Sequence, residues 1–192
     1  MHVHDPEPHW QRAWDGAWRV VTFDLPETRC LERKRLWQAL RAHRLGFLQR
    51  SVWVWPHDVT DLLREIIKVE GVPECFCGFK AVGLFLCTDA EIVRSAWSWE
   101  EILQRQQEYL RQLPALEATC RTAHEPAQLG ALARREQQAF TEATSWDPLL
   151  PQVLWPAGYS GRTVQQRHQR WRTLLCARLS AMARAKQVTF TE

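Results

Sequence analysis

One carboxylate of this chain stands at a position where acids often bind metals or cap helices. The apolar run Val20-Val21-Thr22-Phe23 ends in Asp24, and Pro26 then breaks the chain. The length and β-branched content of the run are typical of a strand that is buried on both faces. A carboxylate at the end of such a strand lies at the edge of the sheet, where it can cap the next helix or bind a divalent metal. The sequence leaves both roles of Asp24 open.

If Asp24 binds a metal, Mg²⁺ or Mn²⁺ is expected, because a hard cation takes oxygen ligands from one or two carboxylates and from substrate phosphates. Glu27 is the next carboxylate along the chain, and the motif holds no histidine and no second aspartate. The catalytic equipment of this motif is therefore sparse.

Other side chains that can bind metals or react are more simply explained as structural. The six cysteines are irregularly spaced, and Cys75-Phe76-Cys77 lacks the spacing of a zinc knuckle. We expect reduced thiols. His168 shares one helical face with Val164 and Trp171, so we expect a hydrogen-bonded core histidine there rather than a ligand.

Composition excludes several classes of protein. The chain has 192 residues, of which 45% are hydrophobic, and 11 are tryptophans, so it can bury a core in which most indoles are packing groups. No apolar run approaches the roughly 18 residues that span a membrane, and the N-terminus does not resemble a signal peptide. We expect a cytoplasmic protein without a membrane partner. The net charge of +3 permits contact with nucleic acid but does not require it.

The pattern of the first half predicts a ferredoxin-like α/β sandwich at 14–90, after a tail or linker stub at 1–13. A strand is expected at 18–23, followed by a helix from Thr28 to about His43 that stops at Gly46. Residues 47–55 are expected to form one strand or two short ones broken near Arg50. A helix from Asp58 or Thr60 to Val69, ended by Gly71 and Pro73, and a strand at 81–87 follow. The order strand, helix, strand or hairpin, helix, strand suits that fold.

The rest of the chain, 91–192, is expected to form a mostly helical C-terminal domain, which makes the fold class α+β. Helices are expected at 89–112, from Leu116 onward after an interruption at Pro114, at 126–144 and at 162–185, with proline-rich connectors at 146–151 and 155–161.

An ordered set of motifs resembles the PaaX-type transcriptional repressors. The set consists of Trp14-Asp15-Gly16-x-Trp18-Arg19, Phe23-Asp24-Leu25-Pro26-Glu27, Gly46-Phe47 with Ser51-Val52-Trp53-Val54 and Pro56, Ala96-Trp97, Asp147-Pro148-x-Leu150-Pro151 and Trp155-Pro156. The resemblance covers most of 14–180. It implies a homodimer that regulates catabolic genes, such as those of phenylacetate breakdown, and that senses an aryl-acyl-coenzyme A.

The resemblance departs at the N-terminus. Repressors of this family read DNA with an N-terminal winged helix, whereas about 13 residues precede Trp14 here, too few for a helix-turn-helix. We therefore expect a dimerising, effector-sensing module whose contact with DNA is weak or indirect. A third hypothesis is a structural or interaction protein that uses the sandwich to dimerise with a full-length repressor. Such a protein would dilute the DNA-binding subunits.

The alternative is a metal-dependent nuclease. The first domain also resembles the small ferredoxin-like nucleases of the CRISPR adaptation machinery, with Asp24 at the end of the first strand and Gln49-Arg50-Ser51-Val52-Trp53 in a later one. That resemblance implies a divalent metal held by Asp24 of two subunits. Because the catalytic equipment is sparse, we expect a binding protein rather than an enzyme.

Overall fold

The structure is a computed structural model that describes residues 6–71 and 76–188, with side chains up to residue 184. The predicted features at His2, His4, Pro73 and Cys75 lie outside the described residues. The chain divides into two compact units. The first unit holds the residues up to Trp99 together with Pro148–Ala157, and the second holds Glu100–Asp147 together with the residues from Gly158 onward.

The first unit is built on a four-stranded antiparallel sheet with the strand order β2-β3-β1-β4. The strands are β1 (Trp18–Phe23), β2 (Gly46–Gln49), β3 (Val52–Trp55) and β4 (Phe76–Ala81). Helix α2 (Cys30–Ala42) follows β1, and α3 (Thr60–Glu70) follows β3. This β-α-β-β-α-β order confirms the predicted ferredoxin-like sandwich and the α+β class.

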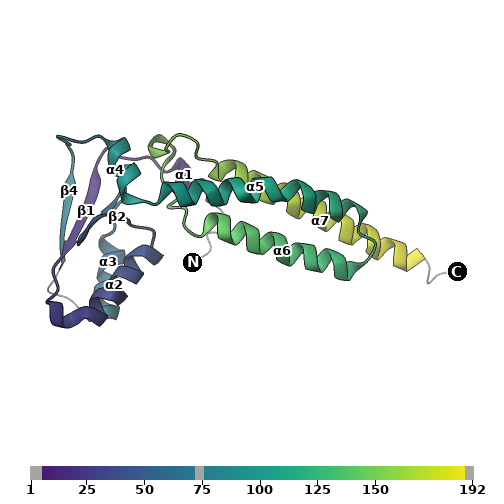
Figure 1. Ribbon diagram of the computed structural model, residues 1–192, viewed down its shortest axis with the longest axis horizontal. Coiled ribbons are helices and arrows are strands. Elements are labelled where there is room, and N and C mark those ends of the chain that lie inside the picture. The colour runs from purple at the N-terminus through teal and green to yellow at the C-terminus, as the bar shows by residue number, and fades with distance from the viewer. Residues whose placement is uncertain (1–5, 72–75, 189–192) are drawn as a thin grey trace. The chain divides into compact units, whose positions relative to one another are not determined.

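Helices α2 and α3 pack side by side against one face of this sheet (Figure 1). The shared core combines Val21 and Trp53 of the sheet with Leu36 and Leu40 of α2 and Ile66 of α3. On the opposite face of β1, Val20 and Thr22 are only half-buried. The prediction that β1 is buried on both faces is therefore wrong, because the two helices cover one side of the sheet.

The predicted strand at 81–87 is also wrong. β4 runs from Phe76 to Ala81 and pairs with all six residues of β1, from Phe23 opposite Phe76 to Trp18 opposite Ala81. That register uses the whole length of β1, so residues 82–87 have no strand beside them and run without regular structure to α4 (Asp89–Ala96). Their apolar sequence resembles a buried strand, but the described chain provides no layer to cover it.

The residues around β2 test two local predictions, the break near Arg50 and the end of the preceding helix at Gly46. The break near Arg50 is confirmed, and this residue has a φ of 39°. Gly46, in contrast, does not end the preceding helix, because Arg44 makes that turn with a φ of 69°. Gly46 is needed for close packing instead, since a Cβ there would lie 2.6 Å from the Trp97 ring and 2.7 Å from the Ala96 Cβ.

The ends of the helices around Asp24 exclude its capping role. A short 3₁₀ turn, η1 (Glu27–Arg29), precedes α2, and neither η1 nor α2 has a side-chain cap. Thr28 is likewise not a cap. The next helix, α3, begins as expected: Asp58 accepts hydrogen bonds from the amide (2.8 Å) and hydroxyl (2.6 Å) of Thr60. Gly71 ends α3 in the left-handed conformation, at φ 65°.

Residues 6–13, expected as a tail, contain the short helix α1 (Glu7–Gln11). Trp10 is buried, and its ring packs edge-on against Trp155 with 5.8 Å between centroids. Trp155 follows the short 3₁₀ turn η2 (Gln152–Leu154), which belongs to the same unit. Two apolar anchors that are distant in sequence thus hold this segment in place.

The second unit consists of three long helices, α5 (Trp99–Thr122), α6 (Pro126–Thr144) and α7 (Gly161–Val188), around one apolar core (Figure 1). Two helix predictions were wrong. The helix expected at 89–112 is split after Ala96, and Pro114 lies inside α5 without ending it. Buried Leu113 and Leu116 anchor both sides of the proline, so packing outweighs the lost hydrogen bond. Among the described residues, no helix is long and apolar enough to cross a membrane.

Candidate functional site

Asp24 lies just beyond the end of β1, and its side chain is exposed. It makes no hydrogen bond or ion pair with the residues that the structure describes. Within that same part of the chain, no group of three histidine, cysteine, aspartate or glutamate side chains is placed to hold a metal ion. Metal binding by Asp24 remains a prediction, and it requires ligands from a second copy or from a substrate.

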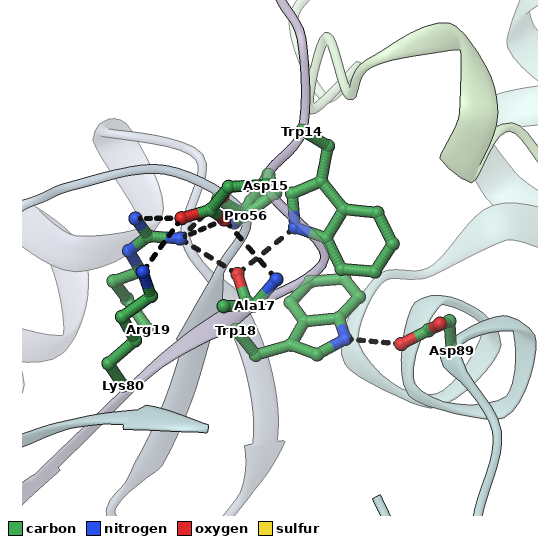
Figure 2. Close-up of polar contacts among 8 residues, drawn as sticks. All are labelled: Trp14, Asp15, Ala17, Trp18, Arg19, Pro56, Lys80 and Asp89. Atoms are coloured by element: carbon green, nitrogen blue, oxygen red, sulfur yellow. Dashed lines mark hydrogen bonds and ion pairs between the residues drawn. The ribbon is translucent and has the colours of Figure 1, made fainter. Parts of the chain in front are cut away.

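The residues of the Trp14–Arg19 motif form a polar cluster at the start of β1 (Figure 2). The two carboxylate oxygens of Asp15 accept hydrogen bonds from the Arg19 guanidinium at 2.6 and 2.9 Å. Lys80, on the neighbouring strand β4, lies 3.0 Å from the same carboxylate. Arg19 also donates to the carbonyl oxygens of Ala17 (2.9 Å) and Pro56 (3.2 Å), so it connects three segments of the chain.

The opposite charges in this cluster shift the pKa values of Asp15 and Arg19. The hydrogen bonds from Arg19 and then from Lys80 hold the pKa of Asp15 far below its usual range. The same carboxylate raises the pKa of Arg19. Both groups stay charged at physiological pH and satisfy each other, which suits a structural clamp rather than a proton-transferring site.

The tryptophans of this region also act as packing groups with satisfied indole nitrogens. Trp14 donates to the Ala17 carbonyl at 3.0 Å, and buried Trp18 donates to Asp89 of α4 at 2.7 Å (Figure 2). Trp97 donates to the Arg44 carbonyl at 3.0 Å. Trp18 therefore secures α4 to β1, and Trp97 secures the turn before β2. The sequence did not reveal these contacts because the partners are distant along the chain.

Buried His57 lies next to this cluster. Burial lowers its pKa to about 4, and the positive charges of Arg12 and Arg19 act in the same direction. Asp15 opposes the shift and His9 adds slightly to it. His57 is thus neutral near pH 7 and is a candidate source of pH-dependent stability rather than a catalytic group.

The most exposed apolar surface of the first unit comprises Phe79 of β4 and the residues that follow the strand. We call it the β4 apolar segment and define it as Phe79, Val82, Leu84, Phe85 and Leu86. The side chains of Phe85 and Leu86 are 84% and 98% exposed. Leu86 also has a φ of 63°, a backbone conformation that branched residues rarely adopt. Contiguous apolar side chains left in water are typical of a surface that binds another protein.

The second unit contains a buried polar network that confirms the core role expected for His168. Its Nδ1 lies 2.8 Å from the Glu136 carboxylate, which also accepts a 2.6 Å hydrogen bond from the Tyr109 hydroxyl. The Phe140 ring stacks on His168 at 3.8 Å between centroids. Burial, followed by the hydrogen bond to Glu136, raises the pKa of Tyr109. Each group is satisfied within the core, so the network links the three helices.

The Asp147-Pro148 motif of the connector is likewise structural. Buried Asp147 accepts hydrogen bonds from Gln106 at 3.1 Å and from the Tyr159 hydroxyl at 2.7 Å. Gly161 lets the Tyr159 hydroxyl approach, because a Cβ there would lie 2.2 Å from it. The motif fixes the start of α7 relative to α5.

An open groove of about 300 Å³ lies along α5 and α6 in the second unit. Its charged lining comprises three carboxylates, Glu101, Glu108 and Glu142, and one guanidinium, Arg105. Arg105 also lies over the ring of the exposed Trp146, 4.8 Å from its centroid. The excess of carboxylates does not suit the phosphates of coenzyme A, whereas the Arg105–Trp146 pair offers a cation beside an aromatic surface.

Comparisons with known proteins find one matching family model and a solved structure with a similar fold. Residues 11–93 match a family model described as the PaaX protein central Cas2-like domain. Among solved structures, the chain is similar to the uncharacterized protein Rv0674 from Mycobacterium tuberculosis, with 18% sequence identity and a TM-score of 0.61. That match covers 93% of this chain and 69% of the other, and at this identity it shows the fold alone. No curated protein matches the chain.

Proposed function

We propose that this chain, which carries the central Cas2-like domain of the PaaX family at residues 11–93, is the dimerising and effector-sensing module of a cytoplasmic transcriptional regulator. The observation that carries the proposal is the β4 apolar segment. It lies beside the edge strand of the sheet, and it is exposed in the single chain.

A second copy of the same chain is the occupant that best fits this surface. β4 is an edge strand whose outer backbone groups are unpaired within the described sheet, and such an edge is a ready template for another strand. Two identical edges can pair antiparallel about a twofold axis, because the same surface then serves on both subunits. The apolar residues that follow β4 supply the hydrophobic contact that edge pairing alone lacks.

The test is the oligomeric state of a double variant, Phe85→Glu with Leu86→Glu, measured by sedimentation velocity. We expect the wild type to sediment as a dimer and the variant as a monomer, because two carboxylates per subunit would be buried without partners. A matched control is Val69→Glu with Val153→Glu, since these apolar side chains are 74% and 71% exposed but lie outside the segment. A monomeric wild type, or a control that dissociates equally, contradicts the proposal.

The proposed effector is an aryl-acyl-coenzyme A, and the exposed Trp146 ring is its proposed contact for the aryl group. Indole presents a flat apolar surface to an aryl group, whereas the carboxylates of the neighbouring groove leave the coenzyme A phosphates outside it. Thermal shift with phenylacetyl-coenzyme A should raise the melting temperature by mass action, whereas acetyl-coenzyme A should have less effect. Trp146→Ala should remove the difference, and an equal response to both thioesters in the wild type would exclude aryl sensing.

The exposure of Asp24 favours one second candidate, a Mg²⁺- or Mn²⁺-dependent nuclease that uses this residue at a dimer interface. Cleavage of duplex or single-stranded DNA that needs the metal and disappears in Asp24→Asn would support it. Glu27→Gln serves as the control, since Glu27 is also exposed at this end of the sheet. If purified wild-type protein does not cleave DNA with either metal, the nuclease candidate is excluded.

A further inference from the structure

The buried ring of His57 has no partner in the part of the chain that the structure describes. The residue is only 8% exposed, and its side chain makes no hydrogen bond or ion pair with the described residues. Buried polar groups in native proteins nearly always have a partner, because an unpaired group loses its hydrogen bonds to water. The partner of His57 must therefore come from outside the described residues, as a solvent molecule or a ligand.

The charges around His57 favour an anion as that partner. In addition to burial, three basic side chains lower the pKa of the ring, namely Arg12, Arg19 and His9. Asp15 acts in the opposite direction, but both of its oxygens already accept hydrogen bonds from Arg19. Asp58, the next residue along the chain, is likewise engaged, since it accepts hydrogen bonds from Thr60. A site with an excess of unpaired positive charge attracts anions from solution.

Arg12 is the cation in this region that is available to a ligand. Its side chain is exposed, and its guanidinium makes no hydrogen bond or ion pair with the residues that the structure describes. Arg19, in contrast, is engaged with Asp15 and two backbone carbonyls. Among the charged neighbours, Arg12 also has the largest effect on the pKa of His57. Since charge interactions weaken with distance, its guanidinium lies near the ring.

Both halves of this candidate site are held in place by the fold. Arg12 directly follows α1, and its amide donates to the His9 carbonyl at 3.3 Å. Helix α1 is anchored through buried Trp10, which packs against Trp155. On the other side, the carbonyl of Pro56, next to His57, accepts a 3.2 Å hydrogen bond from Arg19 (Figure 2). Groups that are fixed before binding lose little conformational freedom when a ligand arrives.

We propose that Arg12 and His57 together bind a small oxyanion, the phosphate or carboxylate group of a metabolite. A guanidinium pairs with two oxygens of such a group, and a neutral imidazole can donate its one N–H to an oxygen. Only a small group can reach a ring that is 8% exposed, which argues against the backbone of a nucleic acid as the source. The site belongs to the first unit, and it stands independently of dimerisation and of the proposed effector contact at Trp146.

The experiment measures the melting temperature of the full-length protein in sodium sulfate, sodium acetate and sodium chloride at equal ionic strength. Sulfate is the main probe, because its charge stays constant over the pH range in which His57 titrates. Arg12→Gln and His57→Gln are compared with Arg35→Gln and His43→Gln, which change exposed residues of the same two types in and just after α2. Circular dichroism verifies the fold of each variant. If His57→Gln does not fold, the exposed Arg12 position decides alone.

Sulfate at a tenfold excess over its dissociation constant should raise the melting temperature of the wild type by roughly 3 to 6 °C relative to chloride. Arg12→Gln and His57→Gln should lose most of this rise, whereas the two control variants should keep it. A larger rise in acetate than in sulfate would assign the site to a carboxylate rather than to a phosphate group.

The pH dependence of binding separates a ligand contact from a structural role of His57. A bound anion favours the imidazolium form, so the wild type should bind sulfate about threefold more tightly at about pH 5 than at about pH 7, measured by isothermal titration calorimetry. His57→Gln should abolish this difference, and His43→Gln should retain it.

Three results would overturn the proposal. One is a wild type whose melting temperature is the same in all three salts. Another is an equal loss in Arg12→Gln and Arg35→Gln, since net charge alone would then explain the effect. The third is a DNA duplex that raises the melting temperature through Arg12 and His57 as strongly as sulfate does, because the anion would then be a polymer backbone.

Discussion

At the residue scale, Arg19 shows why the Trp14–Arg19 motif has this composition. One guanidinium bonds both oxygens of Asp15 and two backbone carbonyls, which requires several donors in a fixed planar arrangement. A lysine at this position would keep the charge but could not make all four contacts. The Trp14–Arg19 motif therefore stabilises the sheet, and its paired charges suit a structural clamp rather than catalysis.

Arg19→Lys should lower the free energy of unfolding by about 1 to 2 kcal/mol, because buried carbonyl acceptors lose their donors. Urea denaturation followed by tryptophan fluorescence measures the difference. Lys80→Gln is the matched control, since Lys80 is exposed and its ammonium pairs with the same carboxylate, a type of surface pair that contributes about 0 to 1 kcal/mol. If Arg19→Lys is as stable as the wild type, the clamp is unimportant.

His57 should make the stability of the protein depend on pH. Above pH 6.5 the residue is neutral in both the folded and the unfolded chain, so it has no effect. Between pH 6.5 and the lowered pKa of about 4, only the unfolded chain takes up the proton, so stability falls as the pH falls. From pH 7 to 4.5 the wild type should lose about 2 kcal/mol more than His57→Gln, measured by urea denaturation.

The pH window separates His57 from the acidic groups nearby. Asp15 has a pKa lowered from 3.8, so its contribution to stability is complete above that value and is lost only at more acid pH. Parallel pH profiles of the wild type and His57→Gln would show that another group titrates in the window.

At the element scale, Pro114 tests how far packing overrides local preference. The residue is exposed inside α5, where it removes a backbone donor, while its neighbours Leu113 and Leu116 are buried. Pro114→Ala should restore the hydrogen bond and stabilise the protein by about 1 to 3 kcal/mol, seen as a higher melting temperature. Ala115→Gly, at an adjacent exposed site, should instead destabilise by up to about 1 kcal/mol. A lower melting temperature for Pro114→Ala would mean that the proline geometry is required by the packing.

Sequence patterns predicted the elements whose partners are supplied by the ordinary fold. β1 was found from its short β-branched apolar run, α3 and α7 were found from apolar periodicity, and the sandwich followed from the order of the elements in the first half. The strand at 81–87 was misplaced because an apolar run has the same composition whether a neighbouring strand, a partner chain or water lies beside it. Periodicity also could not place the break after Ala96, which depends on Trp97 reaching the turn at Arg44.

The candidate site was only partly visible in the sequence for the same reason. The apolar run predicted correctly that Asp24 lies just beyond the end of β1. The polar cluster at the other end of β1 needs Pro56 and Lys80, which come from two other segments of the sheet, so no local pattern predicts it.

At the scale of the whole molecule, dimerisation through the first unit should make the melting temperature of that unit depend on protein concentration. If the β4 apolar segment joins two copies, unfolding of the first unit also separates the subunits, so its melting temperature rises with protein concentration. A tenfold increase in concentration adds about 1.4 kcal/mol, which corresponds to a shift of roughly 2–4 °C for a chain of this size.

The prediction is a concentration-dependent melting temperature for the wild type and a constant one for Phe85→Glu with Leu86→Glu, measured by scanning calorimetry. Val69→Glu with Val153→Glu should keep the concentration dependence, since its side chains lie outside the β4 apolar segment. A shift that persists in the Phe85/Leu86 variant would place the interface elsewhere. A melting temperature that is constant for all three proteins would mean that the exposed segment serves a partner other than a second copy, because a dimer held by this surface cannot unfold independently of its concentration.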